Sequence, residues 1–193
     1  MLARVKIVGF YIGAFALTVA AGWLLGSTVG AHRAEVSHAA YMASQRDYLL
    51  EHVRGIARGN PFPRITLWSV DGVRTAEIGE LLPKGGLLVL VGPGCASCLE
   101  AGTALDSALT LAGPKAVPAI LVTDQAEKSD AFAELLTVRG VHVPVYCDTR
   151  ESLRREYKVL ANPVYFRLDS QLVVADFGPA GQRADEYASI VQR

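Results

Sequence analysis

The sequence predicts an α/β fold in which a mixed central sheet carries helices on both faces, preceded by one N-terminal transmembrane helix. Three observations lead to this prediction. Strand-like and helix-like segments alternate from residue 60 onward, the run Leu87–Val91 is apolar throughout, and residues 7–31 contain no charged side chain. An unbroken apolar run is typical of a strand buried on both faces, and the alternation favours a sheet with helices packed on each side.

The N-terminal segment is long enough to cross a membrane. As a helix, residues 7–31 would extend roughly 37 Å, against a hydrocarbon core of about 30 Å. An uncleaved anchor and a cleaved signal peptide both remain open, and Val29-Gly30-Ala31 is a poor cleavage site, which favours the anchor. Arg4 and Lys6 precede the span and are expected to stay in the cytoplasm. The rest of the chain would then face the periplasm or another extracytoplasmic space.

Glycines recur at four-residue intervals within this span, at Gly9 and Gly13 and again at Gly22, Gly26 and Gly30. This spacing puts small residues on one helix face, where two membrane helices can pack closely. A homodimer through this helix is one expectation. The alternative is that glycine is simply common in membrane helices.

A linker is expected between the anchor and the outward-facing domain. Apolar residues recur at helical spacing from Met42 to Ile56, which predicts a juxtamembrane helix over residues 32–58. Gly59-Asn60-Pro61 should end it. The predicted organisation is therefore a membrane anchor over residues 1–31, a helical linker over residues 32–59 and a folded domain over residues 60–193.

The folded domain shows strand and helix patterns in alternation, with turn residues between them. The expected elements are a hairpin over 65–78, strands over 87–91 and 117–122, helices over 95–112 and 130–139, a strand over 141–146, a short helix from a cap at Asp148 to Tyr157, a hairpin of strands over 164–168 and 172–177, and a helix over 183–191. The hairpins add antiparallel strands, so the sheet should be mixed.

The charge balance argues against nucleic acid as a partner. The chain has 19 basic and 19 acidic residues, and without Arg4 and Lys6 the part from residue 32 onward has 17 basic against 19 acidic residues. A mildly acidic domain excludes a strongly basic binding surface. We expect no nucleic-acid partner, and a lipid bilayer as the partner of residues 7–31.

The residues with the clearest chemistry are Cys95-Ala96-Ser97-Cys98, which begin a predicted helix after a Gly-Pro-Gly turn. Unpaired backbone N–H groups and the helix dipole favour the thiolate form of the first cysteine there. Cys95 is therefore the expected nucleophile and Cys98 the thiol that resolves the mixed disulfide. Ser97 either donates a hydrogen bond to the thiolate or is simply a small residue of the first turn, of which we favour the second.

A metal site is not expected at this pair. A CxxC sequence is also half of a zinc site, but no second CxxC or CxxH pair exists to complete four ligands. We also expect no organic cofactor. The third cysteine, Cys147, is expected to be an inert and partly buried side chain, with a regulatory or second resolving role as the alternative.

The order of apolar strand, Gly/Pro turn, CxxC pair, helix and a later proline at Pro163 resembles the thioredoxin superfamily. In particular it resembles the membrane-anchored TlpA/ResA-like thiol–disulfide oxidoreductases, over roughly residues 60–193. The resemblance implies a thioredoxin-like fold, a redox-active Cys95–Cys98 disulfide, and a cis peptide bond before Pro163. That proline would face the cysteine pair and, with Asn162, hold the substrate. The resemblance also implies protein thiols and disulfides as partners, with a membrane electron donor or acceptor.

The chain departs from this family next to the cysteines. Gly94 and Ser97 stand where Trp and Pro usually precede the two cysteines, Val89 occupies the place of a buried acid, and Glu100 lies one position from the family's catalytic glutamate. Val164 also replaces the usual Thr after the proline. The Pro-Gly-Cys sequence at residues 93–95 is similar to that of the thioredoxin-like accessory proteins of methylamine utilisation. That subgroup is therefore a candidate for the group to which the resemblance is strongest.

The expected function is a membrane-tethered thiol–disulfide oxidoreductase that reduces protein disulfides outside the cytoplasm, in the maturation of exported redox proteins. One alternative is a Cu(I)-handling module, in which Cys95 and Cys98 bind the ion with a histidine such as His142. Another is a docking domain that keeps the fold without efficient redox chemistry. A peroxiredoxin-type peroxidase is not favoured, because no Pro-x-x-x-Thr/Ser-x-x-Cys pattern surrounds either cysteine.

Overall fold

The computed structural model describes residues 55–160, 162–181 and 183–192, together with Ala40, Ala43, Ser44, Asp47, Tyr48 and Val53. The chain divides into two units, Met1–Ser44 and Gln45–Arg193, and the description below concerns the second. The predicted transmembrane helix and its glycine pattern lie outside the described residues. Among the helices that are described, none has both the length and the apolar character needed to cross a membrane.

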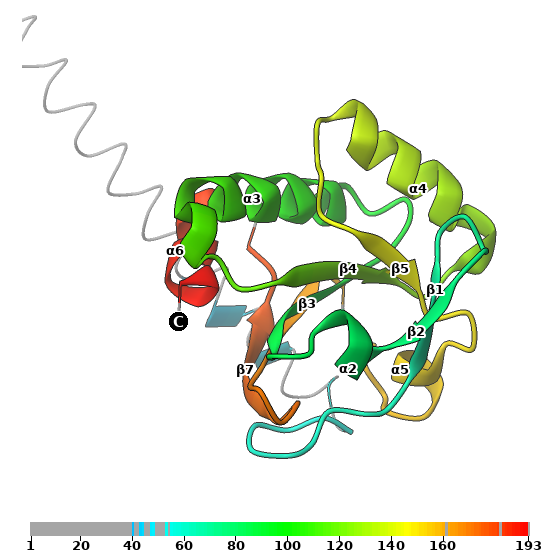
Figure 1. Cartoon of the computed structure of the whole chain (residues 1–193), viewed down its shortest axis with the longest axis horizontal. Coiled ribbons are helices and arrows are strands. Elements are labelled where there is room, and N and C mark those ends of the chain that lie inside the picture. Colours follow the sequence, from blue (N-terminus) through cyan, green and yellow to red (C-terminus); the bar gives the residue numbers. More distant parts are fainter. Residues whose placement is uncertain are drawn as a thin grey trace, which may run out of the picture. The chain divides into compact units, whose positions relative to one another are not determined.

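Seven strands of the described chain form one mixed sheet, in the order β2-β1-β5-β4-β3-β6-β7 (Figure 1). Strands β3, β4 and β5 are parallel neighbours, whereas β6 and β7 on one side and β1 and β2 on the other add antiparallel pairs. The mixed sheet is as predicted. The strands are β1 (Thr66–Ser69), β2 (Thr75–Glu77), β3 (Gly86–Val91), β4 (Ala119–Thr123), β5 (Val145–Cys147), β6 (Val164–Leu168) and β7 (Val174–Pro179).

Helices cover both faces of the sheet, as predicted (Figure 1). Alternate residues of β3 point to opposite faces, so Leu88 and Leu90 join one apolar cluster while Leu87, Val89 and Val91 join the other. The first cluster includes residues of α2 (Ile78–Leu81) and α5 (Ser152–Arg155). The second includes residues of α3 (Ala96–Ala112), α4 (Ala126–Val138) and α6 (Ala184–Val191). A short 3-10 turn, Gly113–Lys115, follows α3.

The linker differs from its prediction at its C-terminal end. Asp47 and Tyr48 are helical, but Val53 instead forms a β-bridge with Val159. Ile56 is only 2% exposed and belongs to the same apolar cluster as α2 and α5. The helix expected up to residue 58 is therefore wrong from Val53 onward, because contacts with the domain outweigh the local helical spacing.

Several further elements have bounds that differ from the predicted ones, among them β5, α4 and α5. The strand expected over residues 141–146 is confined to β5, since Pro144 has no N–H to donate within a sheet interior. The helix expected from residue 130 already begins at Ala126. The short helix expected from a cap at Asp148 to Tyr157 is limited to α5, and its N-cap residue is Glu151. Asp148 lies before this cap, and its Oδ2 accepts a hydrogen bond from the backbone N–H of Leu153 at 2.8 Å.

Candidate active site

The two cysteines lie where β3 gives way to α3. After β3 ends at Val91, the turn Gly92–Gly94 leads to Cys95, which is the N-cap residue of α3. The Cys95 and Cys98 sulfurs are at disulfide-bonding distance, and their Cα atoms are 5.2 Å apart. Cys95 is partly exposed, whereas Cys98 is fully buried. A partner protein can therefore approach Cys95 but not Cys98.

Hydrogen-bond donors lie beside both cysteine sulfurs. The Cys98 backbone N–H donates to Cys95 Sγ at 3.2 Å, and the Ser97 hydroxyl lies 3.1 Å from the same sulfur. The Gly92 N–H donates to Cys98 Sγ at 3.2 Å. Donors aimed at a sulfur favour its charged form when the pair is reduced. Ser97 is thus more than the small first-turn residue that the sequence favoured.

Replacing Ser97 with alanine is expected to slow alkylation of reduced Cys95 at neutral pH. A hydrogen bond worth about 1 kcal/mol corresponds to roughly a fivefold smaller thiolate population. The alkylation rate of the full-length chain as a function of pH measures this, and the midpoint should move to higher pH. Ser107→Ala is the matched control, because that hydroxyl on α3 bonds to the Thr103 carbonyl and not to a sulfur. Identical profiles for the Ser97 variant and the parent chain would contradict the assigned hydrogen bond.

The predicted proline lies at the start of β6. The Asn162–Pro163 peptide bond is cis, as the resemblance implies. Because Val164 pairs with Leu90 of β3, this dipeptide lies beside the turn that leads to Cys95. The Asn162 amide packs against Gly92, where an added Cβ would lie 3.1 Å from Asn162 Nδ2. Substrate binding by Asn162 and Pro163 stays a prediction.

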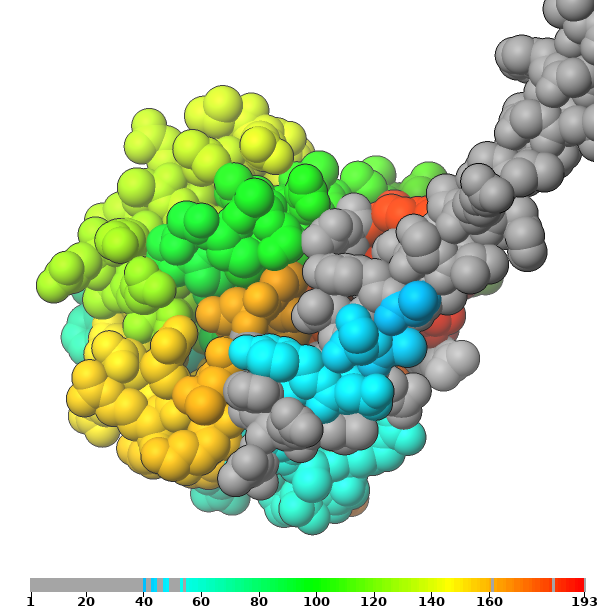
Figure 2. All heavy atoms as spheres, turned by 180° about the vertical axis from the view of Figure 1, so that it is seen from behind, coloured from blue at the N-terminus to red at the C-terminus, as the bar shows by residue number. Residues whose placement is uncertain are grey.

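An open apolar groove of about 440 Å³ lies beside Cys95, and we call it the α3–α4 groove. One wall comes from the start of α3 and the turn before it, and the other from α4. Figure 2 shows α3 in green and α4 in yellow-green next to one another on the surface. Sequence reasoning missed the α4 wall, because no motif indicates that α4 passes beside Cys95. The lining residues are Pro93, Gly94, Cys95, Ala96, Leu99, Lys128, Ala131, Phe132 and Leu135.

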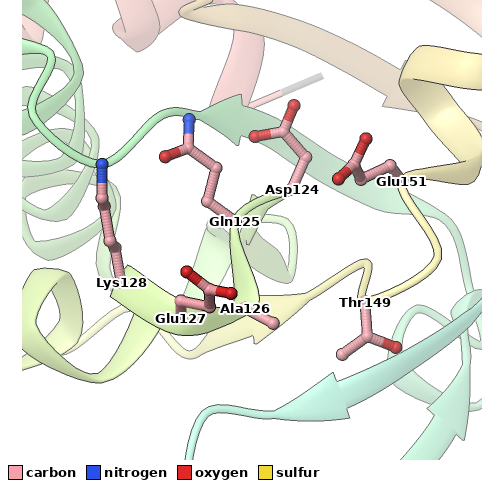
Figure 3. Close-up of a pocket in the computed structure, with 7 residues that line it drawn as sticks. All are labelled: Asp124, Gln125, Ala126, Glu127, Lys128, Thr149 and Glu151. Carbon is pink, nitrogen blue, oxygen red and sulfur yellow. The ribbon is translucent and has the colours of Figure 1, made fainter.

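A second hollow, of about 390 Å³ and more polar, lies where β4 ends and α4 begins (Figure 3). Asp124 lines it, and its side chain is only 1% exposed. Arg154 Nε donates to Asp124 Oδ2 at 2.6 Å, which compensates the buried charge. In the described part of the chain, no three His, Cys, Asp or Glu side chains are grouped as metal ligands.

The structure does not bring His142 to the cysteine pair. Its backbone N–H donates to Asp106 Oδ1, and its ring nitrogen lies 3.7 Å from Asp106 Oδ2. Asp106 lies on α3, eleven residues beyond Cys95, which corresponds to about 16 Å along the helix axis. The Cu(I) alternative that joined His142 to the two cysteines therefore has no geometric support.

Cys147 ends β5 and is 2% exposed. Burial is the main cause that raises the pKa of its thiol to about 11, and nearby carboxylates, Asp148 first among them, act in the same direction. The thiol stays protonated at neutral pH, which supports the interpretation of Cys147 as an inert side chain over a resolving role.

No carboxylate takes the places of the family's catalytic acids. Val89 is fully buried in the same apolar cluster as Cys98, and Glu100 is exposed on α3.

The fold is thioredoxin-like, with a CxxC pair at the N-terminus of α3, and solved structures share this fold. The thioredoxin domain of a thiol-disulfide oxidoreductase from Bacteroides vulgatus matches with a TM-score of 0.58 and 14% identity, over 70% of this chain and 99% of that one. A thiol:disulfide interchange protein from Bacteroides sp. matches with 0.58 and 13%, over 72% and 93%.

StoA from Bacillus subtilis also matches, with a TM-score of 0.54 and 14% identity, over 68% of this chain and 97% of that one. At these identities the likeness establishes the thioredoxin-like fold. No family model matches the sequence, and no curated protein matches it either.

Proposed function

We propose that this chain is a membrane-tethered thiol–disulfide oxidoreductase that reduces protein disulfides outside the cytoplasm. The observation that carries the proposal is the asymmetry of the pair. Cys95 is accessible and has two hydrogen-bond donors at its sulfur, whereas Cys98 is buried one helical turn away. The similar folds of proteins described as thiol–disulfide oxidoreductases support it.

The reaction follows from this asymmetry. The Cys95 thiolate attacks one sulfur of a partner disulfide, the partner's S–S bond breaks, and its other sulfur leaves and takes up a proton. Cys98 then loses its proton and attacks Cys95 Sγ, which releases the second partner thiol. The partner gains two electrons from the dithiol and two protons, one that Cys98 loses and one from solvent that replaces the proton lost when Cys95 ionised. The Cys95–Cys98 disulfide is the product on this chain.

The buried Gly92–Cys98 hydrogen bond supports the second step. As Cys98 loses its proton, the Gly92 N–H is already aimed at its sulfur and stabilises the growing negative charge. The Asn162 amide packs against Gly92. We assign Asn162 and Pro163 to the edge that holds the substrate chain.

The membrane tether and the reducing direction are the finer parts of the proposal. The uncharged segment over residues 7–31 supports the tether, and the TlpA/ResA-like resemblance supports a reductant recharged by a membrane electron donor. The experiment that tests the function is the reaction of the reduced full-length chain with a small disulfide, with the remaining thiols counted by mass.

A further inference from the structure

We infer that the α3–α4 groove binds the substrate segment that carries the disulfide, and that it selects a large apolar side chain next to the reacting cysteine. The inference rests on the proposed function and specifies the substrate class of the same site. It assigns a recognition role to Ala131, Phe132 and Leu135 of α4, which no sequence motif marks.

The reactive sulfur lies in the wall of the groove. Cys95 is itself a lining residue, together with Ala96 and Leu99. Once a substrate sulfur is bonded to Cys95, the Cα atom of the neighbouring substrate residue lies only about 3.8 Å from the Cα atom of the substrate cysteine. A mixed disulfide therefore brings the substrate residues beside its cysteine to the mouth of the groove.

The groove has room beside the sulfur. Gly94 immediately precedes Cys95, has a φ of +81°, and an added Cβ there would have no atom within 4 Å. The space over this residue is thus open to a ligand.

The chemistry of the walls favours an apolar occupant. Apart from Lys128 at the rim, the side chains that line the groove are apolar or belong to Cys95. On α4, Leu135 is 47% exposed, and the exposed apolar surface continues along the helix to Val138, which is 81% exposed. Covering these side chains with another apolar group removes them from water, whereas a polar group would lose hydrogen bonds to water without gaining any here.

The test compares two peptides, supplied as symmetric disulfide dimers, that differ only in carrying leucine or serine next to the cysteine. The reduced full-length chain is mixed with each, the reaction is quenched with acid, and the released peptide thiol is measured by chromatography. We expect the leucine peptide to react at least about tenfold faster, since a fitting apolar group in a pocket discriminates to this degree.

Charged substitutions in the groove should remove this preference. In Leu135→Glu and Ala131→Glu, both at exposed positions, the ratio of the two rates is expected to fall toward one. Leu111→Glu is the matched control, because Leu111 lies on α3, is 81% exposed and does not line the groove. That variant should keep the tenfold ratio.

Two outcomes overturn the inference. One is equal rates for the two peptides with the parent chain, and the other is an unchanged ratio in both groove variants. The proposed function fails separately, if neither peptide nor hydroxyethyl disulfide oxidises the Cys95–Cys98 pair.

Discussion

The Cys98→Ser variant of the full-length chain is expected to accumulate as a mixed disulfide with its substrate and to lose turnover completely. Cys95 can still attack a disulfide, but the variant lacks the thiol that resolves the product. The substitution should leave the fold intact, since the new hydroxyl can accept the hydrogen bond that Gly92 now donates to Cys98 Sγ. Non-reducing electrophoresis of cells that produce the variant measures the trapped species.

Two matched variants define the attacking residue. The double variant Cys95→Ser with Cys98→Ser should trap nothing, because the remaining Cys147 is buried and protonated at neutral pH. Cys147→Ser combined with Cys98→Ser should trap as much as Cys98→Ser alone. If adducts persist without Cys95, or if they require Cys147, then Cys95 is not the nucleophile. The captured proteins also identify the substrates.

The Arg154→Ala variant is expected to lose about 3 kcal/mol of unfolding free energy, because it leaves a buried carboxylate without its cation. Asp124 is 1% exposed on its side chain, and Arg154 is the residue that neutralises it. Asp124 Oδ1 has no hydrogen-bond partner in the described structure, so nothing there takes over the role of the guanidinium. Chemical denaturation of the full-length chain measures the change.

The neighbouring arginine provides the control for this measurement. Arg155 pairs with Glu151 at 2.9 Å on the surface, one helical turn away, with both side chains substantially exposed. A pair of this kind contributes about 0.5 kcal/mol or less, so Arg155→Ala should change stability little. Equal losses of unfolding free energy in the two variants would show that the Asp124–Arg154 pair stabilises the fold no more than a surface pair does.

The sequence predicted the sheet and the helices packed on it well where local signals were strong. The run Leu87–Val91 indicated a strand buried on both faces, and the Gly-Pro-Gly turn followed by Cys95 indicated a helix start. Both signals are local, and both are found in β3 and α3. The resemblance implied the cis bond before Pro163, which the residues alone identified only as a turn before a strand.

Tertiary contacts decided what the sequence missed. Val53 follows the helical spacing of the linker, yet it pairs with Val159, far along the chain. The groove depends on where α4 lies relative to Cys95, and no local pattern encodes that. Ser97 was predicted to be a small spacer because residue type alone does not indicate that its hydroxyl lies 3.1 Å from Cys95 Sγ.

Counting thiols after exchange tests the proposed function most directly. The full-length chain, which has three cysteines, is reduced, treated with hydroxyethyl disulfide at neutral pH, and then alkylated under denaturing conditions for mass measurement. We expect one alkyl group, on Cys147, no bound hydroxyethanethiol, and a Cys95–Cys98 disulfide. Three alkyl groups, or a stable adduct on Cys95 while Cys98 stays free, would contradict the assignment of this pair as an exchanging dithiol.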